Sequence, residues 1–228
     1  MTRTDSATGA AVQAAAESGF RRRLLDGMAA AVRERGYRDA TVADVVRHAR
    51  TSRRTFYEHF AGKQDCFIAL LTERNATVIE QIAAAVDTEA PWQVQIRQAV
   101  EAWIGASQID PTITLAWIRE TPALGESAQR LHRETANAFI ALIQSLTGSA
   151  GFAAAGLRPP SRRLATILYG GFRELIATTV EDGGDIDDIV EVAVAAAGPP
   201  GGAAPRSPPA QRMGFGNCPV IIGRQETG

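Results

Sequence analysis

The chain has 228 residues, with 24 Lys and Arg against 25 Asp and Glu, 45% hydrophobic residues and two cysteines. This length suggests one or two domains with a substantial core, which excludes a small scaffold held together by metal or disulfides. No uncharged apolar stretch reaches the roughly 18 residues of a membrane span, and residues 1–17 lack the apolar core of a signal peptide. We therefore expect a cytoplasmic protein with no membrane partner.

Proline positions and apolar spacing predict an all-α fold. No proline precedes Pro91, and Val and Ile recur at helical rather than alternating intervals. Gly36 and Gly62 are expected to end helices, because glycine adopts the backbone conformations that stop a helix. The expected helices cover residues 18–35, 42–49, 53–60, 63–85, 92–107, 111–120, 126–146, 161–181 and 186–197.

The two ends of the chain are predicted to lie outside these helices. Residues 1–17 are expected to form a flexible N-terminal arm. Residues 198–228 contain seven Gly and six Pro, a composition that buries too little apolar surface to offset the entropy of ordering. We therefore predict a disordered Gly/Pro-rich tail.

Two short helices in the first third of the chain carry N-cap signals. Thr41 precedes the first helix, with Asp44 three residues later as a capping-box partner, and Ser52 precedes the second. The N-terminal region is therefore predicted as a helix, a short helix, a three-residue turn and another short helix.

The helix at residues 53–60 has a polar face suited to the major groove of DNA. At 100° per residue, Phe56 and Phe60 fall on one side, whereas Arg54 and Glu58 point outward. Arg can bind guanine through two hydrogen bonds, and Thr or Tyr can contact phosphates or thymine methyl groups. For a single pair of arginines, an ordinary solvated helix face is a better explanation than DNA binding. The distribution of charge along the chain therefore serves as an independent test of DNA binding.

The near-neutral total charge hides a strong division along the chain. Residues 1–63 hold twelve Lys and Arg against seven Asp and Glu, a net charge of +5, whereas residues 64–228 hold twelve against eighteen, a net charge of -6. The basic residues cluster around the two short helices, as contacts with DNA phosphates require. DNA binding is therefore the leading hypothesis.

The same residues resemble the helix-turn-helix of the TetR (tetracycline repressor) family. The matching segments are Thr41-Val42-Ala43-Asp44-Val45-Val46, then Ser52-Arg53-Arg54-Thr55-Phe56-Tyr57-Glu58-His59-Phe60, and then Gly62-Lys63. Residues 116–125 further resemble a segment of actinobacterial members. The family's organisation implies a DNA-binding domain over residues 18–65, a linker helix over 63–85 and an effector-binding and dimerisation domain over 66–197.

The resemblance also implies roles for individual residues. Arg53 and Arg54 would read bases, and Thr55 and Tyr57 would contact bases or phosphates. The remaining DNA-binding candidates, which would contact phosphates or cap the recognition helix, are Thr41, Arg50, Ser52, His59 and Lys63.

The turn between the two short helices departs from the family pattern. It contains Arg50 and Thr51, where the family usually has Gly and then an apolar residue. An Arg50 in the left-handed conformation would cost on the order of 1 kcal/mol relative to glycine. A phosphate contact by Arg50 would recover part of that energy.

The C-terminal two thirds contain candidates for a ligand pocket. Aromatic residues line many apolar pockets, although an aromatic residue at helical spacing more often fills a core. Arg119, Glu120, His132 and Arg173 are possible ligand contacts, but an ordinary surface or ion-pair role fits each of them better. The aromatic candidates are Trp103, Trp117, Phe139 and Phe172.

The last two predicted helices are candidates for a dimer interface, because they offer more apolar surface than one chain needs to cover. Gly171 and its neighbour Gly170 would allow a second backbone to approach closely. The predicted interface residues are Leu164, Leu168, Gly171, Leu175, Ile189 and Ala193. By family resemblance, a homodimer would bind double-stranded DNA at a near-palindromic operator.

These features predict a homodimeric, sequence-specific DNA-binding regulator, a repressor released by a small-molecule effector of unknown identity. The alternatives are a helical protein-interaction module and a DNA-binding regulator without a ligand. An enzyme is not expected, because no nucleophile, base and orienting group occur together. Cys66 and Cys218 lie too far apart in sequence to suggest a metal site, so we predict neither a catalytic site, nor a metal, nor a cofactor.

Overall fold

A computed structural model describes the backbone of residues 4–198 and the side chains of residues 17–198, and every regular element in this range is helical. The prediction of an all-α fold is therefore confirmed. The α-helices are α1 (Thr4–Asp39), α2 (Val42–His48), α3 (Arg53–His59), α4 (Lys63–Ala85), α5 (Trp92–Gln108), α6 (Pro111–Arg119), α7 (Gly125–Leu146), α8 (Ala150–Ala154), α9 (Arg162–Glu181) and α10 (Val190–Ala197), and two short 3-10 helices are η1 (Thr121–Ala123) and η2 (Ile186–Ile189).

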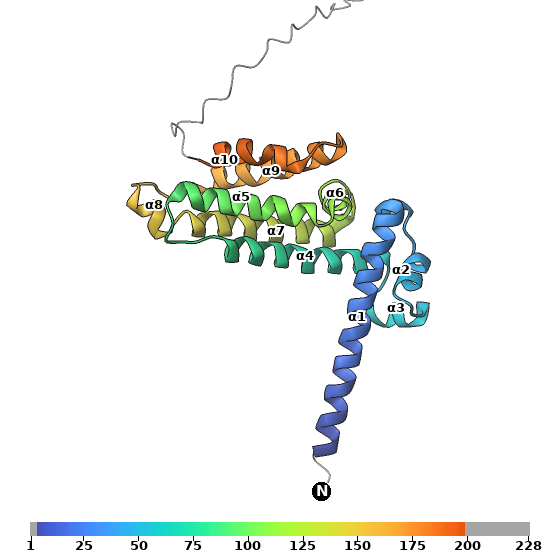
Figure 1. The fold of residues 1–228 in the computed structure, drawn as a ribbon. Helices are drawn as coiled ribbons and strands as arrows, with labels where there is room; N and C mark the ends of the chain where they lie inside the picture. Colours follow the sequence, from blue (N-terminus) through green and yellow to red (C-terminus); the bar gives the residue numbers. More distant parts are fainter. Residues whose placement is uncertain (1–3, 199–228) are drawn as a thin grey trace, which may run out of the picture.

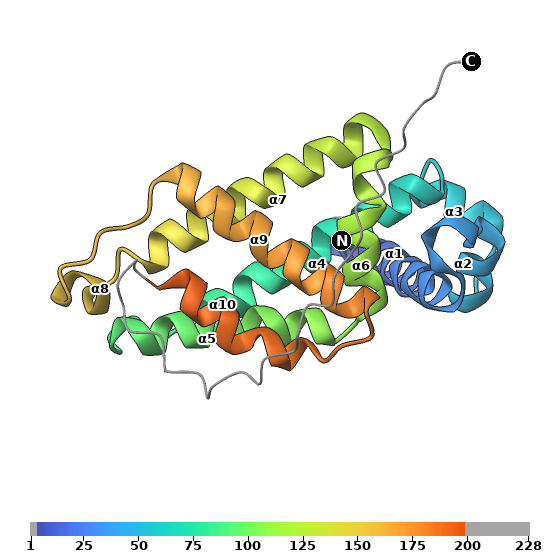
Figure 2. The ribbon, with the colours of Figure 1, turned by 90° about the horizontal axis from the view of Figure 1, so that it is seen from above.

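The helices form a small head at one end of a larger body. In the head, α2 and α3 pack beside α1, which crosses the end of α4 (Figure 1). In the body, α4 packs against both α5 and α7, while α9 covers α7 and α10 covers α5 (Figures 1 and 2). Helix α8 lies at the end of the body farthest from the head.

Three local features differ from the sequence prediction. Helix α1 begins at Thr4 rather than near Ser18, because six of the residues 4–17 are alanine, the strongest helix former. The short helix α8 was not predicted. The last predicted helix is divided into η2 and α10.

Other predicted boundaries agree with the structure. Gly36 interrupts α1 with φ 75° and ψ 161°, the conformation that glycine adopts without steric cost. Helix α4 spans the predicted linker helix. The predicted tail lies outside the described residues, apart from Gly198.

One hydrophobic cluster runs from the head into the body, so the two parts share a core. It begins with Leu24 and Met28 of α1, includes Phe56 of α3 and Phe67 of α4, and continues to Ile113 of α6. This continuity means that the position of the head depends on the packing of the helices beneath it.

The far end of the body is fixed by a buried glutamine. The amide nitrogen of Gln95 donates to the carbonyls of Thr88 and Ala90 at 3.1 and 2.7 Å, and its oxygen accepts from the Ser149 hydroxyl at 2.7 Å. Gly151 packs so closely here that a Cβ atom would lie 2.2 Å from the Ala90 carbonyl oxygen. These contacts hold α8 against the start of α5.

Candidate nucleic-acid interface and ligand cavity

Both short helices of the head begin with the predicted caps. The Thr41 hydroxyl accepts from the Asp44 backbone at 3.3 Å, and the Asp44 carboxylate accepts from the backbone and hydroxyl of Thr41 at 3.0 and 2.6 Å. These bonds, chiefly the one from the Thr41 hydroxyl, and nearby arginines lower the pKa of Asp44 to about 2. Ser52 caps α3 by accepting from the Thr55 backbone at 3.1 Å.

The turn between α2 and α3 has the strained geometry that its sequence suggests. Arg50 has a φ of 50° and is the only described residue other than glycine with a positive φ. Its side chain is exposed, and so is that of Arg53 on the first turn of α3. Neither arginine forms an ion pair with a described residue.

Helix α3 presents its polar residues away from the core. Phe56 is fully buried, whereas Tyr57 is 59% exposed. Arg54 points outward, with an exposed side chain, and donates to Glu58 at 3.1 Å. This pairing neutralises the carboxylate that would otherwise repel DNA phosphates on this face.

Lys63 and His59, both predicted to contact phosphates, are engaged within the chain: Lys63 has hydrogen-bond partners, and His59 is partly buried. The Lys63 ammonium donates to the carbonyls of Tyr37 and Arg38 at 2.9 and 3.0 Å, and it lies over the Tyr37 ring. In the free protein Lys63 therefore ties α4 to the end of α1, a role that the sequence analysis did not foresee. His59 is half-buried beside Phe60.

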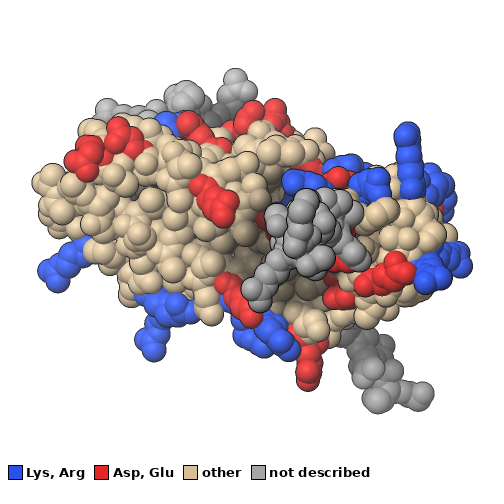
Figure 3. Space-filling view, turned by 90° about the horizontal axis from the view of Figure 1, so that it is seen from below, with Lys and Arg blue, Asp and Glu red and all other residues tan. Residues whose placement is uncertain are grey.

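Basic side chains gather at the end of the molecule that holds the head (Figure 3). Several of them are paired with acids, including Arg33 with Asp110, Arg38 with Glu120 and Arg47 with Glu34. The exposed arginines of the head without an ion pair to a described residue are Arg22, Arg23, Arg50 and Arg53. These four leave positive charge on the surface of the head that no described acid neutralises.

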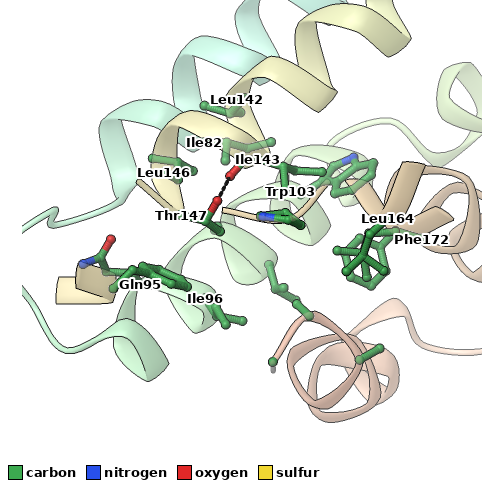
Figure 4. A pocket seen from close by; sticks show the side chains of 18 of the residues that line it. Ile82, Gln95, Ile96, Trp103, Leu142, Ile143, Leu146, Thr147, Leu164 and Phe172 are labelled. Atoms are coloured by element: carbon green, nitrogen blue, oxygen red, sulfur yellow. Dashed lines mark hydrogen bonds between the residues drawn. The ribbon is translucent and has the colours of Figure 1, made fainter. Parts of the chain in front are cut away.

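The body contains a partly open apolar cavity of about 550 Å³. In Figure 4, Ile82, Leu142 and Leu146 lie at one side of it, and Leu164 and Phe172 lie at another. The Thr147 hydroxyl is occupied by the Ile143 carbonyl at 2.7 Å (Figure 4), and Gln95 has the partners described above. Arg158 is the charged residue that lines the cavity.

Three of the four predicted pocket aromatics line this cavity, namely Trp103, Phe139 and Phe172. The fourth, Trp117, does not. It is buried against His132 of α7 and lines a separate hollow of about 50 Å³. Helical spacing alone does not show which of two neighbouring hollows a side chain faces, so the role of Trp117 in a ligand site stays a prediction.

Most of the cavity wall was missed by the sequence analysis. Its aliphatic residues come from α4, α5, α7 and α9, and the end of α10 closes one side with Ala195, Ala196, Ala197 and Gly198. Only their helical apolar spacing could have signalled them, and that spacing is equally typical of a solid core.

Comparison with known proteins identifies the head. Residues 24–70 match the family model described as bacterial regulatory proteins, tetR family. The matched segment covers most of the head and the start of α4. No curated protein sequence matches the chain.

Solved structures share the TetR-family fold at low sequence identity. The FadR transcriptional regulator of Bacillus subtilis, in complex with stearoyl-CoA, matches 77% of this chain and 96% of its own with a TM-score of 0.67 and 16% identity. FadR of Bacillus halodurans gives a TM-score of 0.65 at 16% identity over the same shares of both chains. Reduced NemR of Escherichia coli gives 0.61 at 17% identity, covering 78% of this chain and 95% of its own.

The residues predicted for a dimer interface have different surroundings in the structure. Ile189 and Ala193 are buried within the chain itself, so they offer little surface to a partner. Leu168 and Leu164 line the cavity, and Leu175 is half-buried against the core. Gly171 is exposed.

Helix α9 nevertheless keeps an open apolar face. Ile167 is 69% exposed and Leu164 is 44% exposed. Cβ atoms added at Gly170 and Gly171 would meet no atom of the chain within 4 Å. This face therefore has room for a second helix to approach.

Helix α6 joins the TetR-type head to the body through buried Asp110. The Asp110 carboxylate accepts from Arg33 of α1 at 2.7 Å and from Arg74 of α4 at 3.4 Å. It also caps α6 by accepting from the Ile113 backbone at 3.3 Å. One carboxylate thus holds three helices together.

At the other end of α6, Arg119 and Glu120 form ion pairs with α9 and α1, respectively. Arg38 of α1 donates to Glu120 at 2.9 Å. Arg119 donates to Glu174 at 2.8 Å and to Glu181 at 2.7 Å, both on α9. Ion pairs thus link α9 to α6 and the end of α6 to α1.

No helix among the described residues is long and apolar enough to cross a membrane. The same residues contain no group of three or more side chains that could hold a metal ion.

Proposed function

We propose that this chain is a homodimeric repressor of the TetR family that acts in the cytoplasm and is released from a near-palindromic operator by a small apolar effector. The observation that carries the proposal is the apolar cavity of about 550 Å³ in the body, connected to the head through α6 and Asp110. Cavities of this size and lining bind small molecules.

The charge and exposure of the head support DNA binding. Arg53 and Arg54 lie on the exposed face of α3, where they can reach base edges once the helix enters the major groove. Arg50 and Arg22 are exposed and suited to phosphates.

The open face of α9 supports the homodimer. Exposed Ile167 and the uncovered glycines beside it would be buried by the same face of a second copy, as a two-fold axis requires. Such a dimer would present two copies of α3 to successive turns of DNA.

A structure with a similar fold supports the proposal that the effector is apolar. The similar FadR structure contains stearoyl-CoA, a molecule with a long apolar chain. The lining of the present cavity is likewise mostly aliphatic and aromatic. We therefore infer that the effector of this chain has a large apolar part.

The test is selection of genomic fragments by the purified dimer at low salt, followed by transcription from each selected promoter. We expect one or more near-palindromic sites that overlap promoters, and lower transcription when the protein is bound. A folded dimer that selects no such site would contradict DNA-binding function, and increased transcription would contradict the repressor assignment.

A further inference from the structure

A small hollow whose wall includes several polar side chains lies next to the apolar cavity. It measures about 50 Å³ and is lined by residues of α4, α5, α6, α7 and α9. Trp103 and Phe139 line both spaces, so these two rings form a shared wall. A single water needs a cavity of only about 10–15 Å³, so the hollow has room for a chemical group of a few atoms.

Two hydrogen-bond donors at this hollow have no partner. Tyr169 of α9 is 4% exposed, and its buried hydroxyl has no hydrogen bond in the structure. The buried Nε of Arg173 also has none. An unsatisfied buried donor costs about 1–3 kcal/mol, and native proteins rarely leave such groups without a partner.

Arg173 is also without an acidic partner among the described residues. Its guanidinium lies over the rings of Trp117 and Tyr169, 5.9 and 5.5 Å from their centroids. Its Nη1 is 3.3 Å from Nε2 of His132. Burial and Arg173 lower the pKa of His132, which favours the neutral ring, and an imidazole offers no negative charge to compensate the guanidinium.

The tautomer of His132 makes the cluster richer in donors. A guanidinium can only donate, so Nε2 of His132 must accept from Arg173 and the ring proton must lie on Nδ1. That Nδ1 is buried and has no partner. Arg74, which also lines the hollow, is paired with Asp110. The unpartnered polar groups here are therefore donors that lack an acceptor.

We propose that this hollow binds a carboxylate, held by Arg173 and the Tyr169 hydroxyl. A carboxylate only accepts hydrogen bonds, and it pairs with a guanidinium more strongly than neutral groups do. The carboxylate comes either from the head group of a fatty acid whose chain occupies the adjacent apolar cavity or from a free small acid. This inference rests on the proposed function only where it identifies the bound acid as the effector of the regulator.

The experiment measures binding of dodecanoate, 1-dodecanol and acetate to the full chain by titration calorimetry. We expect dodecanoate to bind at least about tenfold more tightly than 1-dodecanol, as one charge-assisted hydrogen bond would give. Arg173→Gln should remove this preference and leave 1-dodecanol binding within about twofold. Tyr169→Phe, which deletes one hydroxyl and keeps the ring, should weaken dodecanoate binding severalfold even if the Arg173 variant fails to fold.

Arg158→Gln tests the other cation that could pair with a carboxylate, because Arg158 lines the apolar cavity but not the small hollow. The matched control is Arg130→Gln, which removes an exposed charge of α7 that lines neither space. Both variants should leave the preference for dodecanoate unchanged. Acetate binding that depends on Arg173 would assign the hollow to a free small acid. Equal binding of dodecanoate and 1-dodecanol without such acetate binding, or a preference lost in Arg158→Gln and kept in Arg173→Gln and Tyr169→Phe, would overturn the proposal.

These measurements contain no DNA, so they separate the two proposals. Carboxylate binding through Arg173 in a protein that selects no operator would support the site and contradict the regulator. Operator binding that is released by apolar ligands lacking a carboxylate, with no loss in Arg173→Gln, would support the regulator and contradict the site.

Discussion

At the scale of single residues, Arg50 carries a conformational cost in the helix-turn-helix. Its φ of 50° is unfavourable for any side chain with a Cβ atom. Arg50→Gly should stabilise the chain by about 0.5–1 kcal/mol, since the gain in the turn exceeds the greater entropy that glycine loses on folding. Urea unfolding measures this difference.

The same variant tests why an arginine occupies that position. If Arg50 contacts a phosphate, Arg50→Gly should weaken DNA binding and reduce the slope of log affinity against log salt by about one. Arg130→Ala, at an exposed position of α7, is the control for loss of a charge far from the head. A more stable variant with unchanged DNA affinity and salt slope would contradict the phosphate role.

Asp44 makes the stability of the head depend on pH. Its pKa is lowered to about 2 in the folded chain, below the ordinary value of about 3.9 in unfolded peptides. The stabilisation is therefore present above the unfolded value and is lost as the pH falls through the folded value.

Asp44→Asn should accordingly lower stability at pH 5, and the difference from the original chain should shrink as the pH approaches 2. Urea unfolding across this range is the measurement. A difference that stayed constant between pH 5 and pH 2 would show that the charge of Asp44 does not contribute to the cap.

The head residues were the easiest to predict from sequence. Thr41 and Ser52 make short-range contacts that depend on neighbouring residues, so a local pattern contains the information. Lys63 was harder, because its carbonyl partners belong to residues 25 and 26 positions earlier. The donor cluster at Tyr169 and Arg173 is likewise formed by tertiary packing.

At the scale of elements, α9 serves two surfaces at once. Leu168 and Phe172 face the cavity, whereas Ile167 and Gly170 face outward. Its sequence indicates only that the helix has excess apolar surface, and not which side covers a ligand and which covers a partner. Ile189 of η2 and Ala193 of α10 were assigned to the dimer for the same reason, although both are buried within their own chain.

Ile167→Glu tests the proposed dimer surface. A charge placed in an apolar interface is costly, so the dissociation constant of the dimer should rise by at least about a hundredfold. Analytical ultracentrifugation over a range of concentrations measures this change. Ile109→Glu is the matched control, because Ile109 is also exposed, at 71%, but lies between α5 and α6. Equal dimerisation of both variants would exclude α9 as the interface.

At the scale of the whole molecule, the net charge of -1 results from a basic head and an acidic remainder. The sequence was sufficient to divide the chain in this way, because charge and local caps do not require a folded structure to be counted. The ion pairs that connect the head and the body could not be predicted from the sequence. Arg33 and Asp110 are 77 positions apart, and no periodic pattern relates them.

The central claim is that α3 reads DNA sequence through Arg53 and Arg54. The most direct measurement is the affinity of the dimer for a selected operator and for a scrambled duplex at fixed salt. We expect the original chain to prefer the operator by at least about a thousandfold.

Arg53→Ala and Arg54→Ala should each remove about 1–3 kcal/mol of this preference, while the Arg130→Ala control should retain it. Operator preference that survives the simultaneous loss of Arg53 and Arg54 would contradict the account.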